Sequence, residues 1–94
     1  MKQKGWQYFL ELTSNVEDEK LQSELFNLLL TPEEKSSLET RCLIVKALLE
    51  HKLTQRHISE EFNVSIAKIT RGSNELKRIS PKLIAYLKTQ LGVE

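Results

Sequence analysis

The segment TQRHISEEFNVSIAKITRGSNELKR (residues 54–78) decides the fold, because it has the pattern of two short helices joined by a tight turn. Thr54 is a suitable cap for the first helix, and Ser65 is one for the second. Asn63 lies between them, and asparagine tolerates the left-handed backbone of a tight turn. Four apolar side chains are expected to pack the pair at a fixed angle: Ile58, Phe62, Val64 and Ile69. The segment therefore predicts a helix-turn-helix.

Helix signals continue along the rest of the chain, and strand signals are nearly absent. Thr31-Pro32-Glu33-Glu34 is a strong helix start, in which Glu34 completes a capping box with Thr31. The stretch CLIVKALL (42–49) is apolar nearly all round and is expected to be the central buried element. The last helix is expected to turn three side chains inward: Leu83, Ile84 and Leu87. In all we expect six helices, at about 6–13, 17–30, 31–51, 55–62, 66–78 and 81–92.

The chain length of 94 residues fits one small domain with one modest core. We expect a single domain over residues 1–94. It would consist of a dimerisation core (about 1–51), the helix-turn-helix (about 54–78) and a C-terminal helix (about 81–92). A chain of this size is only marginally stable alone, so oligomerisation is expected. The first helix has apolar residues on more than one face, which predicts that it contacts two surfaces, one of them in another subunit.

Charge is divided unevenly along the chain. Residues 1–50 carry six basic and nine acidic side chains, whereas residues 51–94 carry eight basic and four acidic ones. This division suggests that one end serves assembly and the other meets an anion. Apolar runs are far shorter than the ~20 residues that span a bilayer, and the single Cys42 fits a reducing compartment. We therefore expect a cytoplasmic protein with no membrane partner.

The helix-turn-helix carries candidate DNA contacts of two kinds. The exposed start of its second helix is the part that meets base edges in this motif, and basic or amide side chains elsewhere can bind phosphates. The candidates for base contacts are Ser65, Ile66, Ala67, Lys68 and Thr70. The candidates for phosphate contacts are Gln55, Arg56, Lys77 and Arg78, with Ser59 in support. The alternative is an ordinary helical hairpin whose charges only solvate one face.

Gly72 does not fit a generic recognition helix, which normally places a third apolar packing residue at this position. Glycine inside a helix costs ~1 kcal/mol relative to alanine, so its presence needs a reason. A close approach of another group to the backbone would supply one. Arg71 places a guanidinium group beside that gap.

Four collinear stretches resemble the tryptophan operon repressors: LFNLLLTPEE (25–34), TRCLIVKALL (40–49), LTQRHISEEF (53–62) and IAKITRGSNELK (66–77). The sequence ITRGSN is highly specific in this context, and the resemblance covers nearly everything from Trp6 to Leu76. It implies an all-α fold, a six-helix intertwined homodimer with a helix-turn-helix DNA-reading head. It also implies binding to double-stranded operator DNA only when L-tryptophan is bound as corepressor.

The same resemblance implies the ligand site. Arg41 and Arg71 would flank the indole, and Arg71 with Thr31 would hold the carboxylate. Gly72 would make room for the ligand. An arginine–indole stack gains ~0.5–2 kcal/mol, and an arginine–carboxylate contact is a charge-assisted bond. The ammonium group would be received by two main-chain carbonyls of the partner subunit, those of Leu28 and Leu30.

Glu75 departs from the family pattern, which has a small serine near the ligand's ammonium group. Glutamate could accept the ammonium as an ion pair. It could instead pair with Arg71, four residues earlier on the same face, and compete with the ligand carboxylate. A solvated surface pair is the third possibility. Lys68 also departs from the pattern, so the operator sequence cannot be carried over from relatives.

Two other classes of function compete with this one. An enzyme is not expected, because the common catalytic motifs are missing and His51, His57 and Cys42 lack zinc-like spacing. A helix-turn-helix regulator with no ligand, or with a different one, is an alternative on the same scaffold, as is a purely structural dimerisation module. The expected function is an L-tryptophan-activated transcriptional repressor of tryptophan-related genes, with neither metal nor further cofactor.

Overall fold

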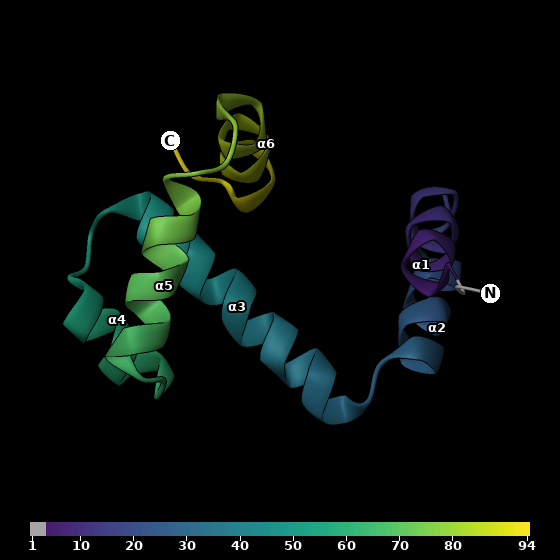
Figure 1. Cartoon of the computed structure of the whole chain (residues 1–94), viewed down its shortest axis with the longest axis horizontal. Coiled ribbons are helices and arrows are strands. Elements are labelled where there is room, and N and C mark those ends of the chain that lie inside the picture. The colour runs from purple at the N-terminus through teal and green to yellow at the C-terminus, as the bar shows by residue number, and fades with distance from the viewer. Residues whose placement is uncertain (1–3) are drawn as a thin grey trace. The chain divides into compact units, whose positions relative to one another are not determined.

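The computed structural model describes residues 4–94, which form six α-helices and no strand (Figure 1). The helices are α1 (Gly5–Ser14), α2 (Glu19–Leu29), α3 (Pro32–Glu50), α4 (Gln55–Phe62), α5 (Ile66–Leu76) and α6 (Pro81–Leu91). This confirms the predicted all-α class. Two helix boundaries, the start of α2 and the end of α5, lie two residues from their predicted positions. The helix α2 begins at Glu19 because Asp18 caps it by accepting a hydrogen bond from the Lys20 N–H, and α5 ends at Leu76.

Local signals place the helix starts and the turn between α4 and α5. The hydroxyl oxygens of Thr54, Ser65 and Ser80 accept backbone hydrogen bonds at the starts of α4, α5 and α6. Asn63 ends α4 in the left-handed region, with φ at +52°. The Ser59 hydroxyl donates to the Val64 carbonyl across the turn. The predicted caps and the predicted turn residue are therefore confirmed.

The described residues divide into two compact units. Residues 4–35 comprise α1, α2 and the first turn of α3, and residues 36–94 comprise the rest of α3 together with α4, α5 and α6. The single domain expected over residues 1–94 stays a prediction.

The core of residues 36–94 lies where α4 and α5 pack on the C-terminal half of α3 (Figure 1). Ile58 and Ile69 are fully buried there beside Ala47. Partly buried side chains surround these three: Ile44, Leu48, Phe62 and Val64. The apolar residues predicted to join the two short helices therefore do so, and α3 supplies the surface on which they pack.

The stretch 42–49 was expected to be the central buried element, and within the single chain it is buried only in part. Ala47 and Leu49 are the buried residues of α3, whereas Leu43 is 50% exposed and Cys42 is exposed. The α3 residues that reach the core form one stripe at i, i+3 and i+4 spacing, so α4 and α5 cover only that stripe. In α6, Leu83 is likewise exposed rather than inward, while Ile84 and Leu87 are half-buried.

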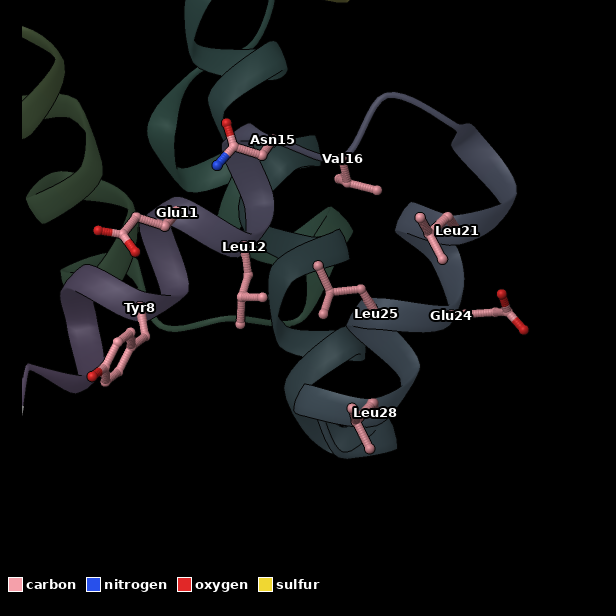
Figure 2. Close-up of a pocket in the computed structure, with 9 residues that line it drawn as sticks. All are labelled: Tyr8, Glu11, Leu12, Asn15, Val16, Leu21, Glu24, Leu25 and Leu28. Carbon is pink, nitrogen blue, oxygen red and sulfur yellow. The ribbon is translucent and has the colours of Figure 1, made fainter.

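Residues 4–35 contain no buried side chain. Trp6 is 72% exposed and Leu28 is 81% exposed. A groove of about 750 Å³ lies between α1 and α2, and Figure 2 shows Leu12 of α1 and Leu25 of α2 turned into the space between these helices. The unit thus exposes a large apolar surface that nothing within residues 4–35 covers.

Candidate ligand and nucleic-acid sites

A cavity of about 600 Å³ lies between α3 and α5. Four of its lining residues belong to the ligand set predicted from the sequence: Arg41 from α3, and Arg71, Gly72 and Glu75 from α5. Apolar side chains form much of the remaining wall: Ile44, Val45, Val64, Leu76 and Ile79. A volume of this size, with apolar walls and a few converging charges, is typical of small-molecule sites.

Gly72 lines this cavity although packing within the chain does not require a glycine. A Cβ atom added at Gly72 would meet only Leu48 Cδ1, at 3.6 Å, which is an ordinary van der Waals contact. The backbone there is helical, and the glycine with positive φ in residues 4–94 is Gly92. Neither a clash within the chain nor a left-handed backbone accounts for Gly72, and its role in making room for a ligand stays a prediction.

Substituting alanine for Gly72 is therefore expected to affect stability and ligand binding in opposite directions. Helix propensity should raise the free energy of unfolding by about 0.5–1 kcal/mol. If the cavity holds the L-tryptophan that the resemblance implies, the new methyl group on its lining should weaken L-tryptophan binding about tenfold. Urea unfolding and calorimetric titration measure the two effects. Gly5→Ala is the matched control, because a Cβ at Gly5 meets nothing within 4 Å. A less stable Gly72→Ala protein would show instead that packing requires the glycine.

The two arginines of the cavity are available to a ligand. Arg41 and Arg71 are both exposed, and the one ion pair within residues 4–94 joins two other residues, Arg78 and Glu75. Arg78 Nη1 lies 3.5 Å from Glu75 Oε1, and the two side chains are 76% and 63% exposed. The structure pairs the Glu75 carboxylate with Arg78 at the surface. Among the described residues it shows no ion pair between Glu75 and Arg71.

The end of α2 presents main-chain carbonyls without their usual donors. The carbonyl of Leu28 would bond to residue 32 in a continuing helix, but Pro32 has no N–H. The Glu34 N–H, which would serve Leu30, donates to Thr31 Oγ1 at 3.1 Å, and the Thr31 N–H donates to Glu34 Oε1 at 2.9 Å. These bonds are the predicted capping box. They leave acceptors at the negative end of a helix, which is a favourable place for an ammonium group.

Thr31 keeps hydrogen-bonding capacity beyond its capping role. Its hydroxyl oxygen accepts from the Glu34 N–H, so its own proton can still donate to a carboxylate. Thr31, Leu28 and Leu30 belong to the unit of residues 4–35, whereas the cavity lies within residues 36–94. The structure therefore brings together four of the seven predicted ligand residues, and the other three form a separate group.

The start of α5 presents the side chains expected to meet base edges. These are all exposed: Ser65, Ile66, Ala67, Lys68 and Thr70. The phosphate candidates Arg56, Lys77 and Arg78 are exposed as well. Ser59 is half-buried, and its hydroxyl proton is engaged by the Val64 carbonyl. A role for Ser59 at DNA stays a prediction, and its observed contact is with the turn.

Two features of this region were missed by sequence reasoning. The Thr70 hydroxyl donates to Gln55 Oε1 at 2.9 Å and ties α5 to α4, but no periodic pattern links residues fifteen positions apart. Lys68 lines the cavity as well as standing at the start of α5. The signal for this was present, because 68, 71, 72 and 75 follow one face of a helix.

Comparison with known proteins covers nearly the whole chain. A protein of Chlamydia trachomatis serovar D named Trp operon repressor homolog is 46% identical over 87 residues, which is 93% of each chain. Proteins of the same name from Chlamydia caviae and Pasteurella multocida are 50% identical over 84 residues and 40% identical over 86 residues. These alignments cover 89% and 92% of this chain, and 83% and 84% of those relatives.

These similarities identify the chain as a transcriptional repressor and not an enzyme. Residues 4–91 match the family described as Trp repressor protein. The chain therefore belongs to the Trp repressor family, and the resemblance seen in its motifs is confirmed. No helix within residues 4–94 has the length and apolar composition needed to cross a membrane.

Proposed function

We propose that this protein is a homodimeric repressor that binds operator DNA when L-tryptophan occupies the cavity between α3 and α5. Residues 54–78 act as a helix-turn-helix, with the start of α5 in the major groove. The regulated genes are those of tryptophan metabolism. The name of the relatives supports this assignment, as does the charge division, which places the excess of basic side chains in residues 51–94.

The observation that carries the proposal is that α5 contributes residues both to the lining of the cavity and to the exposed surface of residues 54–78. One face of α5 supplies Arg71 and Gly72 to the cavity, while its first turn presents exposed Ile66 and Ala67. A ligand wedged against α5 therefore acts on the orientation of the side chains that would read DNA. By linkage, operator DNA must raise the affinity for tryptophan by the same factor that tryptophan raises the affinity for DNA.

The exposed apolar surface supports the homodimer. The large side chains Trp6, Leu28 and Leu43 are at least half exposed, and the fully buried core consists of Ile58 and Ile69 alone among the residues described. Large exposed apolar side chains in both units favour an interaction surface, and a second copy of the chain is the commonest partner for one. Intertwining of the two chains would bring the partner subunit's Leu28 carbonyl toward the cavity between α3 and α5.

A symmetric dimer also fits the requirements of DNA reading. Two copies of α5 must enter successive major grooves about one helical turn apart, which is the established spacing for dimers of this motif, the Trp repressor included. Tryptophan in each cavity would hold the two reading helices at this separation. Without tryptophan, α5 would have no ligand packed against its cavity side. The two copies of α5 would then no longer be held at the spacing needed to bind both half-sites of the operator at once.

The test is retention of sheared genomic DNA, taken from the organism that encodes the protein, by the immobilised protein with and without L-tryptophan. We expect a small set of fragments to be retained only with tryptophan, and retention to fall steeply as salt rises. Arg56→Ala should weaken binding to all fragments and reduce the salt slope by about one, whereas Lys82→Ala on α6 should not. Equal retention without tryptophan would indicate a ligand-independent regulator, and no salt-dependent binding would indicate a structural dimerisation module.

A further inference from the structure

Another cavity, of about 320 Å³, lies within residues 36–94 where the end of α3, α5 and α6 meet. It shares one lining residue, Leu76, with the α3–α5 cavity and is otherwise separate from it. Leucine and isoleucine side chains form its apolar wall: Leu48, Leu49, Leu53, Leu76 and Ile84. The volume is at the lower end of the range of about 300–1,000 Å³ for small-molecule sites, so the cavity suits a small ligand with an apolar body.

The polar side chains on this lining favour an anion. Lys77 from α5 and half-buried Lys88 from α6 contribute two ammonium groups, and among the described residues no carboxylate lines the cavity. The one ion pair within residues 4–94 involves neither lysine. Gln55 contributes an amide whose Oε1 already accepts from the Thr70 hydroxyl at 2.9 Å, which leaves its NH₂ group to donate to a ligand. Two cations and an amide donor attract a negative charge in a partly enclosed site.

His51 is an independent feature of the same cavity. It follows α3 with φ at +55°, in the left-handed region where glycine is the favoured residue after a helix. A histidine there is held in a strained backbone conformation, and strained residues of this kind cluster at functional sites. Its imidazole lines the cavity and can donate a ring N–H to an anion.

The lining overlaps with the predicted DNA surface. Gln55 and Lys77 are candidates for phosphate contacts, and both also line this cavity. An anion held between Lys77 and Lys88 would neutralise the Lys77 ammonium group, which could then bind a DNA phosphate only weakly. Occupation of the cavity and binding of DNA therefore oppose each other, and linkage requires each to weaken the other by the same factor.

We propose that this cavity binds a small aliphatic monocarboxylate, and that the bound anion lowers the affinity of the protein for DNA. The carboxylate meets Lys77, Lys88 and the Gln55 NH₂ group, and the aliphatic chain lies against the leucine and isoleucine wall. The binding of the anion follows from the cavity alone, whereas its effect on DNA rests on the proposed function. The anion acts in the opposite direction to tryptophan.

The first experiment is calorimetric titration of hexanoate into the full-length protein and two variants of equal net charge, Lys88→Glu and Lys82→Glu. Lys88→Glu places a carboxylate on the lining, whereas Lys82 is exposed on the same helix and does not line the cavity. We expect Lys88→Glu to weaken hexanoate binding about tenfold, because a repulsion replaces an attraction. Lys82→Glu should bind as the wild type does. Hexan-1-ol, which has the chain without the charge, should bind at least about tenfold more weakly than hexanoate.

The second experiment is retention of genomic DNA by the tryptophan-loaded protein in hexanoate, with acetate at the same concentration as the control for ionic strength. We expect hexanoate to lower DNA affinity about threefold, the loss expected for about one phosphate contact. The effect should persist in Lys82→Glu and disappear in Lys88→Glu. Circular dichroism verifies that both variants keep their helix content.

The possible outcomes separate this inference from the proposed function. No saturable binding at millimolar hexanoate, or equal binding by wild type and Lys88→Glu, would overturn the anion site. Binding that leaves DNA retention unchanged would overturn the effect on DNA. If the wild type retains no DNA under any condition, the proposed function and the effect on DNA fall together, whereas the titration still decides whether the cavity binds the anion.

Discussion

Replacing Arg71 by alanine is expected to weaken L-tryptophan binding about 100-fold while leaving the fold intact. A hydrogen bond to a charged group contributes about 1.5–3 kcal/mol, and a stacked guanidinium adds about 0.5–2 kcal/mol. The sum corresponds to a factor of about 30 to several thousand in affinity. The fold should be unaffected because Arg71 is exposed and takes no part in the core.

Calorimetric titration with L-tryptophan measures the loss, and far-ultraviolet circular dichroism verifies the helix content of the variant. Lys82→Ala serves as the matched control, because it removes an exposed positive charge from α6, outside the cavity lining. Lys82→Ala should bind tryptophan as the wild type does. Wild-type affinity in Arg71→Ala would remove Arg71 from the ligand site.

Replacing Ile69 by alanine is expected to lower the free energy of unfolding by about 2–5 kcal/mol. Ile69 is fully buried on α5 and packs in the cluster that joins α4 and α5 to α3. Ile58 is the one other fully buried side chain in residues 4–94, so little remaining core can compensate for the cavity created. The same substitution should abolish tryptophan and DNA binding together, because both depend on the placement of α5.

Urea unfolding at one fixed protein concentration measures this effect, since the stability of a dimer depends on concentration. Ile66→Ala is the matched control, because Ile66 is the same residue type on the same helix and is 47% exposed. It should change the free energy of unfolding by no more than about 0.5 kcal/mol. A loss below about 1 kcal/mol in Ile69→Ala would contradict the proposed core.

The parts of the fold that local chemistry determines were predictable from the sequence. Caps at Thr54 and Ser65, the left-handed turn at Asn63 and the capping box at Thr31 each depend on residues within a few positions of one another. The packing role of Ile58 and Ile69, which are fully buried, followed from the helix-turn-helix pattern. Short-range rules therefore gave the elements and the packing of α4 on α5.

Prediction from the sequence was wrong where the burial of a side chain depends on which distant residues pack against it. The apolar run 42–49 predicted the central buried element, but within one chain only Ala47 and Leu49 of this run are buried, and Leu43 is 50% exposed. An apolar sequence run predicts that its side chains are buried, but it does not predict whether residues of the same chain or of another chain bury them. The exposure of Leu43 is consistent with covering by a second copy.

The candidate site was predictable to a similar extent. Helical spacing placed Arg71 and Glu75 on one face, and the family resemblance predicted Arg41 and Gly72 beside Arg71. The structure brings these four residues to the lining of one cavity. The partner of Glu75 was not predictable, because Arg71 at i−4 and Arg78 at i+3 are both at helical contact spacing. Only the side-chain arrangement distinguishes them, and it pairs Glu75 with Arg78.

The central claim is that the α3–α5 cavity is a tryptophan site built around Gly72. Calorimetric titration of L-tryptophan into the purified protein tests it most directly, because it requires no knowledge of the operator. We expect saturable binding in the micromolar range with one site per subunit, and much weaker binding of indole-3-carboxylate. Absence of heat up to millimolar L-tryptophan would contradict the claim and leave a repressor that responds to a different signal.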